Sequence, residues 1–269
     1  MSLATALRAL RAGPIEEVLI YDGPGVFKDS VRSLKEVLSQ MGLPWSVKEV
    51  SVVNGRLLPP PEKWKRGKTL FVMTGGRCQS WDQELSSSIE KIRQFVNEGG
   101  FYLGICAGGY FASARSEFRH SQTKLMVKKR PLALFPGKAT GPLFFNPEAI
   151  PYGISWEPRV VPLRWAGEED EIPVLISGGP HFSFANSDQS TVLAQARDDH
   201  NQIVNAVVKT ANGLGISVLL NWHPEDALID EVAFESRFPL FNWTLIRQEL
   251  ESSKMERQAL FARLLQEFR

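Results

Sequence analysis

One stretch constrains the fold of this chain more than any other. Residues 104–108 read Gly-Ile-Cys-Ala-Gly, between an apolar run at 101–103 and a helix-compatible stretch at 109–115. This order is typical of a nucleophile elbow, in which one side chain projects above the edge of a sheet and the flanking glycines avoid a Cβ collision. Unpaired N–H groups of the following helix favour a thiolate, so Cys106 is the candidate nucleophile. A buried structural cysteine is the alternative.

Strand and helix patterns alternate along the first part of the chain. Apolar runs that end at glycine-containing turns predict strands at residues 17–22 and 69–73, and residues 46–53 are predicted to form another strand between them. Helical spacing predicts helices over residues 30–40 and 81–96. Such alternation is typical of an α/β fold whose sheet is mostly parallel and covered by helices on both faces.

The turns after these strands are candidate parts of a binding site, because ligands of parallel sheets bind outside the carboxyl ends of the strands. Asp22 ends the first strand, Gly75 and Gly76 follow the third, and Ala107 follows Cys106. Backbone N–H groups at such turns can closely approach a developing oxyanion. We therefore expect Gly75, Gly76 and the N–H of Ala107 to form an oxyanion hole, with a simple tight turn as the alternative for the glycines.

The middle of the chain changes character. Residues 118–146 carry no acidic side chain and six basic ones, Arg119, Lys124, Lys128, Lys129, Arg130 and Lys138. The segment is either a basic lip over the pocket or a solvated hairpin surface, and the second is favoured because charge runs usually face water. With the short alternating runs that follow, it predicts a β-rich insertion over about 117–212. Those runs lie at residues 159–165, 172–177, 190–196 and 202–209.

A second functional motif, Asn-Trp-His-Pro-Glu at 221–225, follows the apolar run 213–220, which predicts another strand. An imidazole titrates near neutral pH, so His223 is the natural base to take the thiol proton and then protonate a leaving amine. Glu225 can accept a hydrogen bond from the other ring nitrogen and orient the ring. The alternative is a helix entry with proline in the first turn.

Length and composition limit the classes of function. With 269 residues, 43% of them hydrophobic, the chain can form one domain over residues 1–269, with a core at about 15–251 and a C-terminal helical segment at about 239–269. A net charge of +1 gives no reason to expect a nucleic-acid or membrane partner. Two cysteines, no secretory leader and no long apolar run predict a cytoplasmic protein.

Three motifs together carry a resemblance to a known family. They are residues 20–25 (Ile-Tyr-Asp-Gly-Pro-Gly), 104–113 (Gly-Ile-Cys-Ala-Gly-Gly-Tyr-Phe-Ala-Ser) and 178–182 (Gly-Gly-Pro-His-Phe). The cysteine elbow followed by His-Pro-Glu resembles the class I glutamine amidotransferase superfamily, and the three motifs resemble the amidotransferase-like N-terminal domain of biotin-protein ligases. The resemblance implies a flavodoxin-like fold with Cys106 as nucleophile, His223 as base and Glu225 as orienting carboxylate.

The chain departs from this family at one informative position. Ammonia-channelling members usually have glutamine two residues after the second elbow glycine, where this chain has Tyr110. Tyr110 and His181 are candidates to line the pocket, with core packing as the favoured alternative. Cys78 is either a resolving thiol for Cys106 or, as we favour, a structural cysteine. No histidine has a second ligand at metal-like spacing, so no metal is predicted.

These observations predict a thiol-dependent amidase or amidohydrolase that uses Cys106, His223 and Glu225 on a small amide and requires no cofactor. Transfer of ammonia would need a synthetase or ligase partner that the sequence does not identify. Biotin ligation is not expected, because no Gly-Arg-Gly-Arg type loop is present. The competing hypothesis is a binding or regulatory module that keeps the pocket without turnover.

Overall fold

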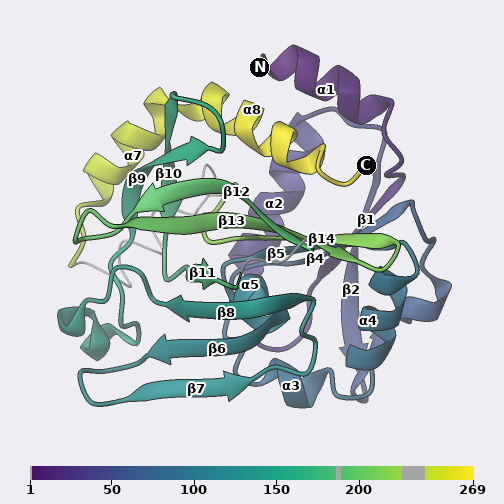
Figure 1. Cartoon of the computed structure of the whole chain (residues 1–269), viewed down its shortest axis with the longest axis horizontal. Helices are drawn as coiled ribbons and strands as arrows, with labels where there is room; N and C mark the ends of the chain where they lie inside the picture. Colours follow the sequence, from purple (N-terminus) through teal and green to yellow (C-terminus); the bar gives the residue numbers. More distant parts are fainter. Residues whose placement is uncertain (1, 186–188, 226–239) are drawn as a thin grey trace.

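The computed structural model describes residues 2–185, 189–225 and 240–269, and a ten-stranded sheet runs through it (Figure 1). The order of the strands is β10-β9-β12-β13-β14-β5-β4-β1-β2-β3. Their bounds are β1 Glu17–Tyr21, β2 Ser46–Val53, β3 Arg56–Leu58, β4 Thr69–Met73, β5 Phe101–Ile105, β9 Arg159–Trp165, β10 Glu171–Ile176, β12 Ser190–Arg197, β13 Ile203–Asn212 and β14 Gly215–Leu220.

Five neighbouring strands, β2, β1, β4, β5 and β14, form a parallel core. Every residue of β4 and β5 is buried, as their continuous apolar sequences require. Gly104 of β5 pairs with Met73 of β4 on one side and with Leu219 of β14 on the other. The carboxyl ends of three strands therefore meet at the elbow, and the predicted α/β fold with its first strands is confirmed.

The sheet as a whole is mixed, so the expectation of a mostly parallel sheet was wrong. Only residues 213 and 214 connect β13 to β14, and such a short link can join only antiparallel strands. The strands β12, β9 and β10 then continue the sheet in antiparallel pairs, and β3 pairs antiparallel with β2 at the opposite edge. Much of the predicted β-rich segment therefore extends the main sheet.

A second sheet of four strands contains the basic segment. Its order is β11-β8-β6-β7, and its bounds are β6 Ser113–Arg119, β7 Leu125–Lys129, β8 Phe135–Gly141 and β11 His181–Ser183. Figure 1 shows this sheet on one side of the main sheet and the C-terminal helices α7 (Trp243–Ser252) and α8 (Lys254–Leu265) on the other. The C-terminal segment is helical, as predicted, and is interrupted at Ser253.

The remaining helices surround the parallel core. They are α1 Leu3–Arg11, α2 Lys28–Gln40, α3 Trp81–Glu84, α4 Ile89–Asn97 and α5 Ala107–Ala112, with short 3₁₀ turns at Pro61–Lys63 and Pro147–Tyr152. The single helix predicted over 81–96 is divided, because the intervening serines hold the β2–β3 hairpin. Ser88 accepts a hydrogen bond from the N–H of Leu57, and Ser87 donates to the carbonyl of Gly55.

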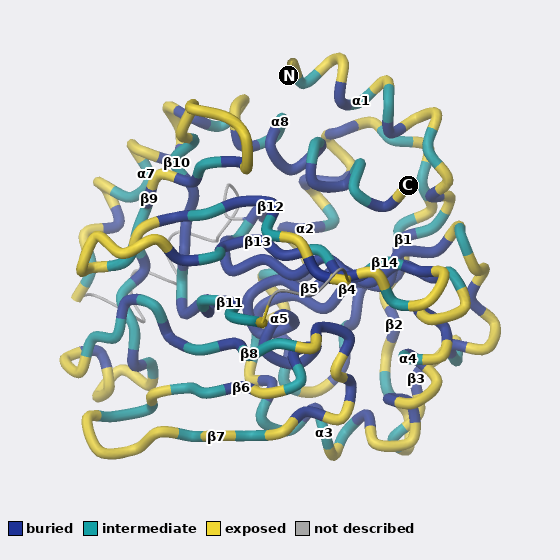
Figure 2. The backbone as a smooth tube through the Cα atoms, viewed as in Figure 1, coloured by how far each residue is buried: buried dark blue, intermediate teal, exposed yellow. Residues whose placement is uncertain are grey.

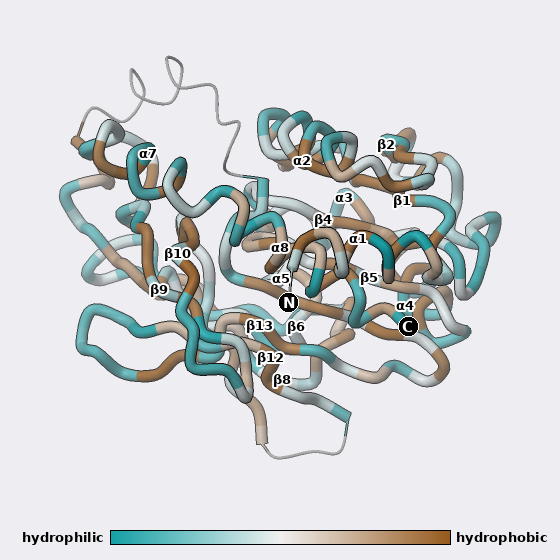
Figure 3. Tube along the Cα trace, turned by 90° about the horizontal axis from the view of Figure 1, so that it is seen from above, coloured by the Kyte–Doolittle hydropathy of each residue, from teal (hydrophilic) through white to brown (hydrophobic). Residues whose placement is uncertain are grey.

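Burial is concentrated where the central strands and α5 meet (Figure 2). The helix α2 buries Val31, Leu34, Val37 and Leu38, and Figure 3 shows hydrophilic residues on its outward turns. Across the described ranges, no helix combines the length and the hydrophobicity needed to cross a lipid bilayer.

Leu103 tests whether the centre of the parallel core stabilises the fold. Its side chain is 1% exposed in β5, whereas Leu214 in the β13–β14 turn is 84% exposed. We expect Leu103→Ala to lower the free energy of unfolding by about 2–5 kcal/mol and Leu214→Ala to change it by less than about 0.5 kcal/mol. Urea unfolding followed by circular dichroism measures both. Equal losses in the two variants would contradict the arrangement.

Candidate active site

Cys106 lies between β5 and α5 in a backbone conformation that is rare outside glycine. Its φ is 50° and its ψ is −101°, and its N–H donates to the carbonyl of Leu220, 2.9 Å away. A Cβ on Gly108 would overlap the backbone oxygen of Met73, and one on Gly104 would lie 2.7 Å from the oxygen of Gly108. The two glycines therefore let the strand, the turn and the helix approach closely enough to hold Cys106 in this position.

His223 and Glu225 form a buried pair just beyond β14. The N–H of His223 donates to the carbonyl of Leu175, 2.9 Å away, which ties the turn to β10. Nδ1 of His223 lies 2.9 Å from Oε1 of Glu225, and the side chains are 13% and 3% exposed. The hydroxyl of Ser30, in the first turn of α2, donates to the same carboxylate oxygen. Glu225 therefore lies within hydrogen-bond distance of the ring that it is predicted to orient.

The carbonyl oxygen of Ser177 brings the thiol and the imidazole together. Sγ of Cys106 is 3.4 Å from this oxygen, and Nε2 of His223 is 3.3 Å from it. The carboxylate of Glu225 and the carbonyl of Ser177 accept hydrogen bonds, so this geometry suits an imidazole that carries a proton on each ring nitrogen. Burial alone would lower the pKa of His223, but the charges of Glu225 and Cys106 and hydrogen bonds with both raise it well above its usual value.

A cavity of about 910 Å³ opens beside these residues. Gly75 lies against the imidazole, since a Cβ there would be 3.1 Å from Cε1 of His223. Gly75, Gly76, Cys106 and Ala107 all line the cavity. The N–H groups of Gly76 and Ala107 donate to no atom in the described part of the chain, so both are available to an oxygen of a ligand.

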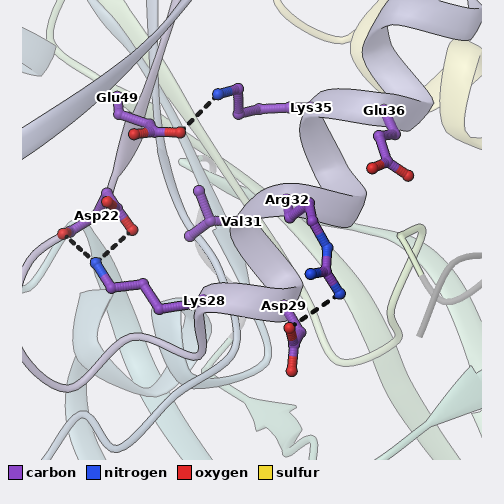
Figure 4. A pocket seen from close by; sticks show the side chains of 8 residues that line it. All are labelled: Asp22, Lys28, Asp29, Val31, Arg32, Lys35, Glu36 and Glu49. Carbon is purple, nitrogen blue, oxygen red and sulfur yellow. Dashed lines mark hydrogen bonds and ion pairs between the residues drawn. The ribbon is translucent and has the colours of Figure 1, made fainter. Parts of the chain in front are cut away.

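The other predicted site residues are placed differently. Tyr110 lines the cavity, but its hydroxyl donates to the carbonyl of Gly178, 3.1 Å away, and burial raises its pKa well above the usual value. Asp22 lies in a separate surface pocket, where it pairs with Lys28 at 2.7 Å (Figure 4). His181 does not line the cavity, because its Nδ1 accepts a hydrogen bond from the N–H of Asn205 in β13.

Cys78 lines the same cavity, but its thiol and its carbonyl oxygen are both hydrogen-bonded by Arg130. Its Sγ is 3.2 Å from Nη2 of Arg130, whose Nη1 also donates to the carbonyl of Cys78. Burial raises the pKa of the Cys78 thiol to about 11, although the charge of Arg130 opposes the shift. The thiol is therefore protonated at neutral pH, which agrees with the favoured structural interpretation.

Three residues of the site were missed in the sequence. In the sequence, Ser30 is only the first residue of a predicted helix, and Ser177 only the last residue of a predicted strand. Arg130 belonged to a basic run assigned to solvent, yet it is 5% exposed and pairs with Asp82 at 2.6 Å. The available signals were a polar residue directly before the Gly178-Gly179 turn for Ser177 and one at a helix start for Ser30, but neither specifies a partner far away in the chain.

The amino-acid sequence matches a known protein family over most of its length. The family described as biotin-protein ligase, N terminal, matches residues 16–269. An uncharacterized protein of Chlamydia muridarum is 32% identical over 213 residues, which are 78% of this chain and 81% of that protein. A biotin-protein ligase of Schizosaccharomyces pombe is 30% identical over 240 residues, which are 85% of this chain but only 37% of the ligase.

Solved structures are more distant. A β-galactosidase from Rahnella sp. R3 aligns with a TM-score of 0.45 and 13% identity, over 84% of this chain and 32% of that one, and so weak a likeness supports no argument. The family match, in contrast, extends over nearly the whole chain and includes the elbow and the His-Pro-Glu turn. The chain belongs to the family of biotin-protein ligase N-terminal domains.

Proposed function

We propose that this protein is a thiol-dependent amidohydrolase acting on a small amide, with Cys106 as nucleophile, His223 as acid and base, and Glu225 as the orienting carboxylate. The observation that carries the proposal is the convergence of Sγ of Cys106 and Nε2 of His223 on one oxygen at the wall of a large cavity. Cys106, His223 and Glu225 then follow one another in space in the order of nucleophile, base and orienting group that a catalytic triad requires.

The parallel core supports a flavodoxin-like, class I amidotransferase-like fold. Its strands lie in the order β2-β1-β4-β5-β14, so that the second strand of the core along the chain is at the edge, followed by the first, third, fourth and fifth. This is the order of the flavodoxin-like sheets, whose ligands bind at the carboxyl ends of the strands. Cys106 and His223 follow the fourth and fifth core strands at that edge.

The proposed reaction has two steps. The thiolate of Cys106 attacks the amide carbonyl carbon, and the N–H groups of Gly76 and Ala107 stabilise the oxyanion. The C–N bond breaks as the imidazolium of His223 gives its proton to the departing amine, which leaves a thioester. His223 then takes a proton from water, the hydroxide attacks the thioester, and the C–S bond breaks to release the acid and the thiolate.

The contact with Ser177 favours a second candidate, a regulatory module that binds a ligand without turnover. In the structure both reactive groups are engaged by the Ser177 carbonyl, so a substrate must displace that oxygen before attack. A module that never reacts would keep this arrangement with its ligand bound. Turnover assays separate the two candidates.

Ammonia release from a panel of primary amides tests the enzyme directly. We expect Cys106→Ala to abolish release and His223→Gln to lower kcat/KM by about 10²–10⁴, because the general acid and base is lost. Cys78→Ala is the matched control and should retain activity. If no amide releases ammonia with the wild-type protein, or if Cys106→Ala is as active as wild type, the enzyme proposal is wrong and the regulatory module is favoured.

The protonation of His223 gives a second test. A carboxylate stabilises the imidazolium and the neutral amide of Glu225→Gln does not, so the substitution should lower the pKa of His223 and the ring should lose its proton at a lower pH. NMR titration of the imidazole measures the midpoint. Ser30→Ala, which keeps the carboxylate, should keep a midpoint well above about 6.5. A wild-type midpoint near 6.5, or one unchanged by Glu225→Gln, would contradict the ion pair.

A further inference from the structure

Arg130 is a buried cation directly after the edge strand β7. The strand alternates, so that Met126 and Lys128 line the cavity while Val127 and Lys129 are exposed, and Arg130 continues the cavity side. The favoured interpretation of the basic run as a solvated surface is therefore wrong for this side of the strand. Burying an arginine is costly unless acceptors meet its N–H groups, so the partners of Arg130 indicate its role.

The guanidinium of Arg130 joins two segments of the chain. On one side, Nε donates to the hydroxyl of Ser116 at 2.9 Å, and the backbone N–H of Arg130 donates to the carbonyl of Ala114 at 3.0 Å, both in β6. On the other side, Nη1 donates to the carbonyl of Cys78 at 3.1 Å and pairs with Asp82 of α3 at 2.6 Å. A planar fork holds these acceptors at the same time, which the single ammonium of a lysine does not reproduce.

The two joined segments carry the two proposed oxyanion donors. Cys78 lies two residues after Gly76, in the loop that follows β4. The strand β6 follows directly on α5, whose first residue is Ala107. Arg130 therefore connects the loop of one donor to the chain that continues from the helix of the other.

The turn after β1 holds the same loop from another side. The N–H of Phe27 donates to the carbonyl of Gly75 at 3.0 Å, and the N–H of Arg77 donates to the carbonyl of Gly25 at 2.7 Å. Gly76 lies between these two hydrogen bonds. The contact of Arg130 with the loop adds a restraint from the second sheet, next to the segment that these bonds fix.

We propose that Arg130 is a positioning residue that fixes the N–H groups of Gly76 and Ala107 relative to each other, so that both reach one oxyanion. Donors act at about 2.7–3.1 Å from the oxyanion, so a loop displaced by about 1 Å loses much of the stabilisation. The oxyanion rests on the proposed function, whereas the restraint on the loop rests on the contacts of Arg130.

Reversible addition of an aldehyde to Cys106 tests the inference without requiring turnover. The thiolate forms a bond to the carbonyl carbon of butyraldehyde, the π electrons of the C=O bond move to its oxygen, and this oxyanion takes the place of the one formed from an amide. The adduct blocks alkylation of Cys106 by iodoacetamide. Mass spectrometry gives the concentration of butyraldehyde that halves the alkylation rate.

Arg130→Lys keeps the positive charge and removes the planar fork. We expect it to raise the half-protecting concentration of butyraldehyde about tenfold, because the two donors no longer meet the oxyanion together. The alkylation rate of Cys106 without aldehyde should stay unchanged, since iodoacetamide reacts at a saturated carbon and forms no oxyanion. Lys129→Gln changes a neighbouring charge on the exposed side of β7 and should change neither value.

Ser116→Ala is a second variant, which keeps the pair with Asp82 and serves if Arg130→Lys does not fold. It frees the guanidinium from β6 and should raise the half-protecting concentration about threefold. A value equal to that of wild type in the folded variants, or no protection of wild-type Cys106, would overturn the inference. A tenfold slower alkylation without aldehyde would also overturn it, because Arg130 would then act on the thiol itself.

Ammonia release separates this inference from the proposed function. Arg130→Lys should lower kcat about tenfold and leave KM unchanged, since the oxyanion forms only in the reaction. Weaker aldehyde protection in Arg130→Lys, without ammonia release by the wild type, would support the positioning role and contradict the amidohydrolase. Ammonia release and aldehyde protection that Arg130→Lys both leaves unchanged would support the amidohydrolase and contradict the positioning role.

Discussion

The first turn of α5 lies directly against the end of β4, and the candidate site depends on this close approach. A side chain at Gly108 would overlap the carbonyl of Met73, and one at Gly104 would press on Gly108. Because both positions are glycine, the backbone can turn sharply at Cys106 and place this residue in the lining of the cavity. The loops after β4 and β14 then reach the same point, so glycine backbone, thiol and imidazole meet there.

The parts of the site that were predictable are those encoded by local patterns. Continuous apolar runs specified β1, β4 and β5, since strands buried on both faces need them. The rule that strand ends share one edge then placed Cys106 and His223 together, although they are far apart in the sequence. The same rule misplaced Asp22, because Lys28 holds its carboxylate at the surface beside α2.

The rest depended on contacts that no local pattern encodes. The mixed sheet follows from the two-residue link between β13 and β14, which makes these two strands antiparallel and so joins the β-rich segment to the parallel core. The orienting contact of Ser30 with Glu225 joins residues 195 positions apart. The period-two alternation along β7 did indicate which face of the strand carries Lys128, but only the fold determines that this face borders the cavity.

The chemistry proposed for this cavity requires that His223 activate Cys106. The most direct measurement is the rate of iodoacetamide alkylation of Cys106 at pH 7 in the wild type and in His223→Gln, with buried Cys78 as an internal reference in each sample. We expect Cys106 to react well ahead of Cys78 and to react at least roughly tenfold more slowly without the imidazole, because only the thiolate is nucleophilic. Equal rates for Cys106 in the two proteins would show that His223 does not activate the thiol.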